Sequence, residues 1–272
     1  MTSNLLGNTA GDVLETVFEA DPAELLVVNP SSKTAEAVVR TADETPDPPE
    51  IRLLAERDAL KQVADKFTVA SAAADLVADE TLSLRTATDL PQNALLATDE
   101  RVVALVAAGD GVGGIGTDDA PFHDTVLEAY DTEWREAEAF TFRAPARSAV
   151  ESSLAESLGE DVEADFDAML TSATTARGDG EGLDEVVLSL LAAAKHRELL
   201  YDISKWGEDT GVASKATFSR TKTRLEEAGL IETEKVPIDV GRPRLRLTLA
   251  DERLQDAEAS ELAGVAASVL AA

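Results

Sequence analysis

The C-terminal third of the chain carries helix breakers and caps in an order that strongly constrains its fold. An expected helix over residues 199–209 is broken by Gly211, and Ser214 is then well placed to cap a second helix. That helix runs to Ala228 and ends at Gly229, a residue type favoured just past helix ends. Two helices joined by a short turn that contains glycine predict a helix-turn-helix.

A pair of strands follows this motif. Residues 230–236 are strand-like, residues 237–241 suit a turn, and residues 242–250 alternate leucine with polar residues. Alternation of period two places the leucines on one face of a strand and the polar residues on the other. Together with an amphipathic helix over residues 183–196, these segments predict an α+β winged helix-turn-helix domain at residues 183–250, with the hairpin as its wing.

The basic residues of this acidic chain are gathered in the same region. The whole chain has 24 lysines and arginines against 53 acids, and its net charge is −29. Between Lys195 and Arg246 there are eleven basic residues and nine acids, so this segment has a net charge of +2. A local reversal of charge is typical of a domain that binds a polyanion. We therefore expect double-stranded DNA as the partner of this domain.

The acidity elsewhere is typical of halophilic proteins. In molar salt the Debye length is about 3 Å, so dense carboxylates repel one another weakly while they keep the protein hydrated. An acidic mesophilic protein is the alternative. The chain has no cysteine, no apolar run near the ~20 residues that a membrane span needs, and no secretory signal at its start. We expect a cytoplasmic protein without a membrane partner.

The second helix of the motif has an outer face of hydrogen-bond donors. Phe218 and Leu225 lie on the expected core side, and the opposite side carries no acid. A major groove admits one helix, and arginine can bind guanine through two hydrogen bonds, so Arg220 is the expected base-reading residue. Ser214 and Lys215 begin the helix, where its dipole attracts a phosphate. The expected DNA-binding residues are Ser214, Lys215, Thr217, Ser219, Arg220, Thr223 and Arg224 on the helix and Arg242, Arg244 and Arg246 on one face of the wing strand.

The remaining sequence predicts three further parts. Residues 1–145 alternate expected strands and helices, with a buried strand at residues 25–28, and predict an α/β domain with a mixed sheet and flanking helices. Residues 146–182 are expected to form a helical connector that ends in a flexible Gly-rich linker. Residues 251–272 predict a helix whose small apolar face packs on another subunit or on the wing domain. This helix leads us to expect a homodimer.

Three stretches of the C-terminal third carry a family resemblance. They are Ser214-Lys-Ala-Thr-Phe-Ser-Arg220, Leu225-Glu-Glu-Ala-Gly-Leu-Ile231 and Gly241-Arg-Pro-Arg-Leu-Arg-Leu247. With the acidic N-terminal part, the chain resembles the TbsP-like family of haloarchaeal winged-helix transcription regulators. The resemblance implies a sequence-specific regulator of metabolic genes that works as a dimer. It also implies an N-terminal domain similar to the degenerate sensor domains of TrmB-type sugar regulators.

A sensor site is expected where the first buried strand meets a helix. Asn29, Ser31, Ser32 and Lys33 follow that strand. Open α/β sheets bind ligands at this edge, and helix N-termini favour anions. A small-molecule metabolite such as a sugar phosphate would fit this effector-binding site. The alternative is a capped helix start without a ligand.

Two other patterns do not support a cofactor or an enzyme. Residues 111–116 match G-x-G-x-x-G, but no helix opens at the third glycine, so we expect a strand-end loop and no cofactor. A phospholipase-D-like hydrolase needs two His-x-Lys motifs, and Thr125 stands where lysine should follow His123. Without cysteine or H-E-x-x-H, neither a catalytic thiol nor a metal site is expected. A winged-helix protein-interaction adaptor is the first alternative function, and a hydrolase-like enzyme is the second.

Overall fold

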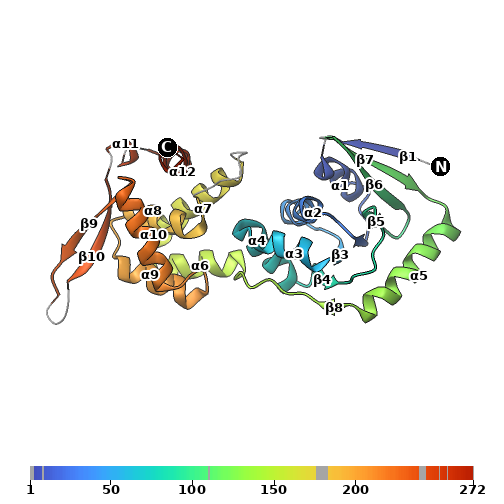
Figure 1. Ribbon diagram of the computed structural model, residues 1–272, viewed down its shortest axis with the longest axis horizontal. Coiled ribbons are helices and arrows are strands. Elements are labelled where there is room, and N and C mark those ends of the chain that lie inside the picture. Colours follow the sequence, from blue (N-terminus) through green and yellow to red (C-terminus); the bar gives the residue numbers. More distant parts are fainter. Residues whose placement is uncertain are drawn as a thin grey trace. The chain divides into compact units, whose positions relative to one another are not determined.

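The computed structural model describes residues 3–7, 9–109, 111–175, 183–238, 243–250, 252–255 and 257–271. The chain divides into two compact units, Met1–Ala146 and Arg147–Ala272 (Figure 1). Each unit has a hydrophobic interior of its own. None of the helices within the described ranges combines the length and the apolarity needed to cross a bilayer.

The N-terminal unit is built on a mixed sheet with helices on both faces. Within the described residues the sheet has eight strands in the order β1-β7-β6-β5-β2-β3-β4-β8. The pairs β2–β3 and β3–β4 are parallel, and the other pairs are antiparallel. In chain order the elements are β1 (Ser3–Gly7), α1 (Ala10–Phe18), β2 (Glu24–Val28), α2 (Ser32–Glu44), β3 (Glu50–Ala55), α3 (Arg57–Ala64), α4 (Phe67–Ala78), β4 (Leu82–Thr86), β5 (Leu95–Ala97), β6 (Val102–Ala108), β7 (Gly111–Thr117), α5 (Ala120–Glu136) and β8 (Glu138–Ala139). The predicted α/β fold with a mixed sheet is confirmed.

The central strand β2 explains why both faces of the sheet are covered. Its residues 25–28 are each at most 1% exposed. Leu25 and Val27 join a core with residues of α1 to α4, whereas Leu26 and Val28 pack with residues of α5 on the other face. Successive side chains of a strand point to opposite faces, so a continuous apolar run needs cover on both sides. The unit therefore has three layers.

The glycine-rich segment at residues 111–116 is part of strand β7 and not the loop that we expected. β7 pairs with β6 along its length and with β1 over residues 112–116. The loop interpretation is wrong because these two neighbours use the backbone hydrogen bonds of the segment. β1 itself was not predicted, since its partner lies about a hundred residues further along the chain.

The C-terminal unit is mainly helical and ends in a hairpin and two further helices. Its elements are α6 (Arg147–Leu158), α7 (Glu160–Thr175), α8 (Glu185–Lys195), α9 (Leu200–Thr210), α10 (Lys215–Glu227), β9 (Ile231–Val236), β10 (Arg244–Leu249), α11 (Glu252–Gln255) and α12 (Ala259–Leu270). α9 and α10 are the helices of the predicted helix-turn-helix, and β9 and β10 are the strands of the predicted wing.

Helices α6 and α7 belong to this unit, although we expected them to form a connector. α7 packs on α8 and α12, and α6 packs on α9. Val150, Leu154, Phe166 and Met169 are at most 1% exposed. The apolar stripe at residues 150–170 therefore contributes to the core and does not act as a spacer. The flexible linker was expected at residues 172–182, but residues 172–175 belong to α7, and residues 176–182 lie outside the described residues.

Helix α12 finds its partners within its own unit. It packs on α7 and α8, and Ala259, Leu262, Ala263 and Ala266 are buried. Of the two predicted packings for this apolar face, the one within the same unit is therefore the one observed. A helix whose apolar face is already covered no longer argues for a second subunit.

Candidate nucleic-acid interface and ligand pocket

The turn between α9 and α10 brings the two helices of the motif into close contact. α9 ends at Gly211, whose φ of +81° is in the left-handed region. Gly207 lies against the buried ring of Phe218, and a Cβ at position 207 would overlap that ring. The hydroxyl of Ser214 caps α10 by accepting a hydrogen bond from the Thr217 amide at 3.2 Å. The predicted glycine turn and serine cap are both confirmed.

Helix α10 presents a strip of small and basic side chains to solvent. Phe218, Thr221 and Leu225 are buried on its inner side. Up to position 224 its exposed residues are Lys215, Ala216, Ser219, Arg220, Thr223 and Arg224. Arg220 Nη2 lies 3.4 Å from Thr217 Oγ1 and forms no ion pair with a described residue. The predicted outer face is therefore present, with Arg220 near its centre.

The hairpin buries Leu247 and Leu249 but does not leave its two described arginines free. Leu247 and Leu249 are at most 5% exposed. The Arg244 guanidinium lies 4.4 Å from the centre of the Tyr201 ring, and its Nη1 lies 3.6 Å from Asp202 Oδ1. Arg246 is half-buried, and its Nε has no hydrogen-bond partner among the described residues. The expectation of aligned guanidinia that are free for DNA is corrected for Arg244 and Arg246, because β10 packs beside α9. Arg242 lies outside the described residues.

Most basic side chains of this region already contact carboxylates. Of the ten basic residues between positions 195 and 246 that the structure describes, seven form ion pairs, namely Lys195, Arg197, Lys205, Lys215, Lys222, Arg224 and Arg244. The Arg224 pair is long, with Nη2 at 3.9 Å from Asp184 Oδ2. The charge count from the sequence therefore overstates the positive charge that is available to a polyanion.

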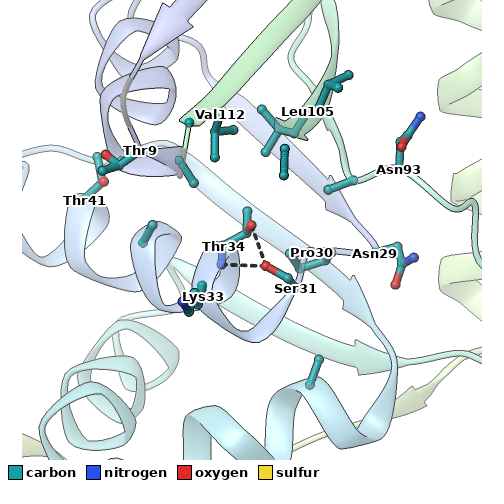
Figure 2. Close-up of a pocket in the computed structure, with 18 of the residues that line it drawn as sticks. Thr9, Asn29, Pro30, Ser31, Lys33, Thr34, Thr41, Asn93, Leu105 and Val112 are labelled. Carbon is teal, nitrogen blue, oxygen red and sulfur yellow. Dashed lines mark hydrogen bonds between the residues drawn. The ribbon is translucent and has the colours of Figure 1, made fainter. Parts of the chain in front are cut away.

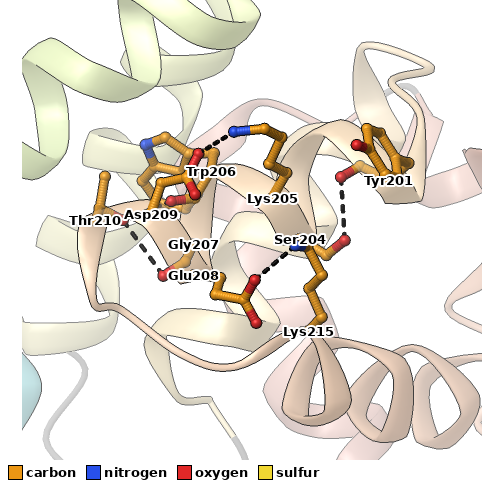
Figure 3. A network of polar contacts seen from close by, with 9 residues as sticks. All are labelled: Tyr201, Ser204, Lys205, Trp206, Gly207, Glu208, Asp209, Thr210 and Lys215. Atoms are coloured by element: carbon orange, nitrogen blue, oxygen red, sulfur yellow. Dashed lines mark hydrogen bonds and ion pairs between the residues drawn. The ribbon is translucent and has the colours of Figure 1, made fainter.

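Two of these carboxylates come from the end of α9, beside the start of α10 (Figure 3). Lys215 Nζ lies 2.5 Å from Glu208 Oε2, and Lys205 contacts Asp209. The hydrogen bond between Lys215 and Glu208 lowers the pKa of the Glu208 carboxyl and raises the pKa of the Lys215 ammonium. We expected an outer surface without acids, and this is wrong at the first turn of α10, because a neighbouring helix supplies the acids.

A groove of about 380 Å³ lies between α9, α10 and the hairpin. Three of the predicted DNA-binding residues, Lys215, Ser219 and Arg244, line it together. Tyr201 and Ile238 also line it and are 46% and 40% exposed. The fold therefore brings one side of the helix and the base of the wing strand to a single depression.

Sequence comparison decides the family. The family described as "Transcriptional regulator TbsP-like, C-terminal HTH domain" matches residues 146–267, and the one described as "Transcriptional regulator TbsP-like, N-terminal" matches residues 2–145. The chain belongs to the TbsP-like transcriptional regulators. This confirms the resemblance seen in the sequence, and the TbsP-like chain is a DNA-binding transcription regulator with a helix-turn-helix in its C-terminal half.

Other comparisons add little to the TbsP-like assignment. Among solved structures the chain is similar to TrmBL2, described as an archaeal chromatin protein with a novel mode of DNA binding. The identity is 14% and the TM-score 0.37, over 51% of this chain and 54% of TrmBL2. The chain thus matches about half the length of that protein, and no DNA contact is inferred from it. No curated protein sequence matches the chain.

The N-terminal unit of this TbsP-like regulator contains a pocket of about 980 Å³ (Figure 2). One face of α2 lines it with Lys33, Ala37, Arg40, Thr41 and Glu44, at the spacing of successive helical turns. The lining also includes polar residues from other segments, namely Thr9 at the N-cap of α1, Glu15 in α1, Glu56 after β3, and Gln92 and Asn93 before β5. Leu105 of β6 and Val112 of β7 add apolar surface. The pocket therefore combines hydroxyl, amide and charged groups with an apolar wall.

Three of the four predicted effector-binding residues line this pocket. They are Asn29, Ser31 and Lys33, whereas Ser32 begins α2 outside the lining. The Ser31 hydroxyl caps α2 and accepts a hydrogen bond from the Thr34 amide at 3.1 Å. Asn29 has a positive φ of 48° and donates to the Pro91 carbonyl at 2.5 Å. Sequence reasoning missed Arg40 and Thr41, although they lie seven and eight residues after Lys33 and so share its helix face.

Proposed function

We propose that the regulator reads DNA sequence by placing α10 in the major groove, with Ser219, Arg220 and Thr223 against base edges. The observation that carries this proposal is the exposed strip on α10, where Arg220 has no carboxylate partner in the described chain. Arginine can donate two hydrogen bonds to guanine, and serine and threonine can bind several bases. Arg220 is therefore the residue that discriminates guanine from the other bases.

The remaining predicted DNA-binding residues surround this strip and suit phosphate contacts. Ser214, Lys215 and Thr217 begin α10, where backbone amides and the helix dipole favour an anion. Arg224 follows one helical turn after Arg220, and Arg244 lines the same groove as Lys215. Arg246 and Arg242 complete the proposed set on the wing strand. Phosphate contacts of this kind fix the position of the protein and carry no sequence information themselves.

Selection from a pool of random duplexes tests this function. The full-length protein is expected to enrich a short motif that contains guanine, because the base contacts proposed for α10 favour some sequences over others. Binding that enriches no motif would contradict base reading by α10, and failure to bind any duplex would favour the protein-interaction adaptor. The same experiment tests the expected homodimer, for which two recognition helices would select half-sites about one DNA turn apart. A single unrepeated site would argue for a monomer, in line with the covered face of α12.

We also propose that the N-terminal pocket binds a small polar metabolite that controls DNA binding. Its volume is within the range of about 300 to 1,000 Å³ of small-molecule sites, and its hydroxyl and amide groups suit a polyol. Lys33 and Arg40 lie on the same face of α2 and would bind a phosphate group. Glu15, Glu44 and Glu56 also line the pocket, so a neutral sugar is the competing ligand class.

Calorimetry with a neutral hexose and with the same hexose carrying a phosphate separates these ligands. If the two cations bind a phosphate, Lys33→Ala and Arg40→Ala will weaken binding of the phosphorylated sugar by about tenfold or more, in the range of a lost charged hydrogen bond. DNA binding without ligand is expected to stay intact. Ser32→Ala is the matched control, because Ser32 lies next to Lys33 but outside the lining. Equal heats of binding of the phosphorylated sugar for wild type and variants would contradict a phosphate-binding role for Lys33 and Arg40.

A further inference from the structure

The first basic residue of α10 is held by a carboxylate of the preceding helix. Lys215 Nζ lies 2.5 Å from Glu208 Oε2, and the two side chains are 45% and 47% exposed. Glu208 belongs to the last turn of α9 and Lys215 to the first turn of α10, on either side of the Gly211 turn. Lys205 contacts Asp209 in the same place (Figure 3). Two anionic groups therefore lie where the helix N-terminus would meet DNA phosphate.

We propose that Glu208 acts as an internal substitute for phosphate, so that DNA binds by exchanging a backbone phosphate for this carboxylate on Lys215. This inference rests on the proposed function of α10. The exchange leaves the Glu208 carboxylate without its lysine, beside the polyanion. A carboxylate in that position takes up a cation from solution.

The exchange changes the salt dependence of binding. A lysine that neutralises one phosphate releases condensed cations from DNA, and each such contact makes the slope of log affinity against log salt steeper by about 0.9. Uptake of a cation by the freed Glu208 offsets this release. The Lys215 contact is therefore expected to contribute almost nothing to the slope. Arg220, which has no ion pair with a described residue, gives no such offset.

The groove geometry supports access for the phosphate. Lys215 lines the groove between α9, α10 and the hairpin together with Ser219 and Arg244. A phosphate seated there would lie beside the side chain of Lys215. Only the rotamers of two half-exposed side chains must change for the exchange, and exposed ion pairs are weak enough to open.

Glu208→Gln tests the inference, with titrations of a labelled duplex of the selected motif over potassium chloride concentrations from about 0.1 to 1 M. Without the carboxylate, Lys215 binds phosphate with net cation release. The variant is expected to bind more tightly than wild type at low salt. The ratio of the variant's affinity to that of wild type should grow by about eightfold for each tenfold dilution of salt. This is the change expected when one more phosphate contact makes the slope of log affinity against log salt steeper by about 0.9. Asp58→Asn is the matched control, because it removes the same charge from the exposed Lys61 pair on α3.

The same substitution in a Lys215→Gln background shows whether its effect on the slope depends on the ion pair. In Lys215→Gln protein, the further change Glu208→Gln is expected to leave the slope unchanged, since the lysine that it would free is absent. The inference is overturned if Glu208→Gln behaves as Asp58→Asn does, or if its effect on the slope persists without Lys215. Failure of the wild type to bind any duplex would refute the proposed function itself, and with it this inference.

Discussion

Helix α10, the proposed recognition helix, and the wing hairpin look alike in sequence and differ in the structure. Both carry arginines at regular intervals, and both lie in the one basic segment of an acidic chain. On α10, Arg220 points into solvent without an ion pair to a described residue, whereas Arg244 of β10 stacks on Tyr201 and contacts Asp202. The neighbours decide the difference, because Arg220 lies on the exposed face of α10 whereas β10 packs beside α9. Counting charges therefore does not measure the charge that DNA can reach.

The largest expected effect comes from removing the support beneath α10. Gly207→Ala places a Cβ into the ring of Phe218, so α10 must move away from α9 or the ring must leave its site. Overpacking of this kind costs about 1 to 3 kcal/mol. Chemical denaturation should show this loss in the C-terminal unit, and duplex selectivity should fall because the exposed strip on α10 is displaced. The pairing of β9 with β10 does not depend directly on Gly207. The substitution is therefore expected to displace α10 and to leave the hairpin paired.

Gly264→Ala is the matched control for that substitution. Gly264 lies in α12, is exposed, and has nothing within 4 Å of a Cβ added there. Alanine is favoured over glycine in a helix by up to about 1 kcal/mol, so this variant is expected to be at least as stable as wild type. If Gly207→Ala were equally harmless, the close contact of α9 and α10 would not be what positions the recognition helix.

Local signals in the sequence predicted most of the fold. Caps and breakers such as Ser214, Gly211 and Gly229 act on adjacent backbone, so the ends of α9 and α10 followed from the sequence within a residue or two. The pairing of β1 with β7 could not be predicted, because register between distant strands depends on the assembled sheet. The role of α6 and α7 was missed for a related reason. An apolar stripe shows that a helix is covered but not which element covers it.

In the candidate sites too, features set by local sequence were predictable and features set by tertiary packing were not. Helical periodicity was enough to place Ser219, Arg220 and Thr223 on one exposed face of α10. Ion-pair partners were not predictable, because Glu208, Asp202 and Asp184 reach their cations only through tertiary packing. The N-terminal pocket was located at the right strand end, and the rest of its lining comes from segments that only the folded sheet brings together.

The most direct test compares Arg220→Ala with Arg244→Ala on two duplexes, one with the selected motif and one with a scrambled sequence. Arg220→Ala is expected to lose about 1 to 3 kcal/mol on the motif and little on the scrambled duplex, because a base contact distinguishes sequences. Arg244→Ala is expected to weaken both equally, and by less than about tenfold, because its guanidinium already has partners in the free protein. Arg57→Ala, in an exposed pair of the N-terminal unit, should change neither. An equal loss on both duplexes for Arg220→Ala would contradict the account.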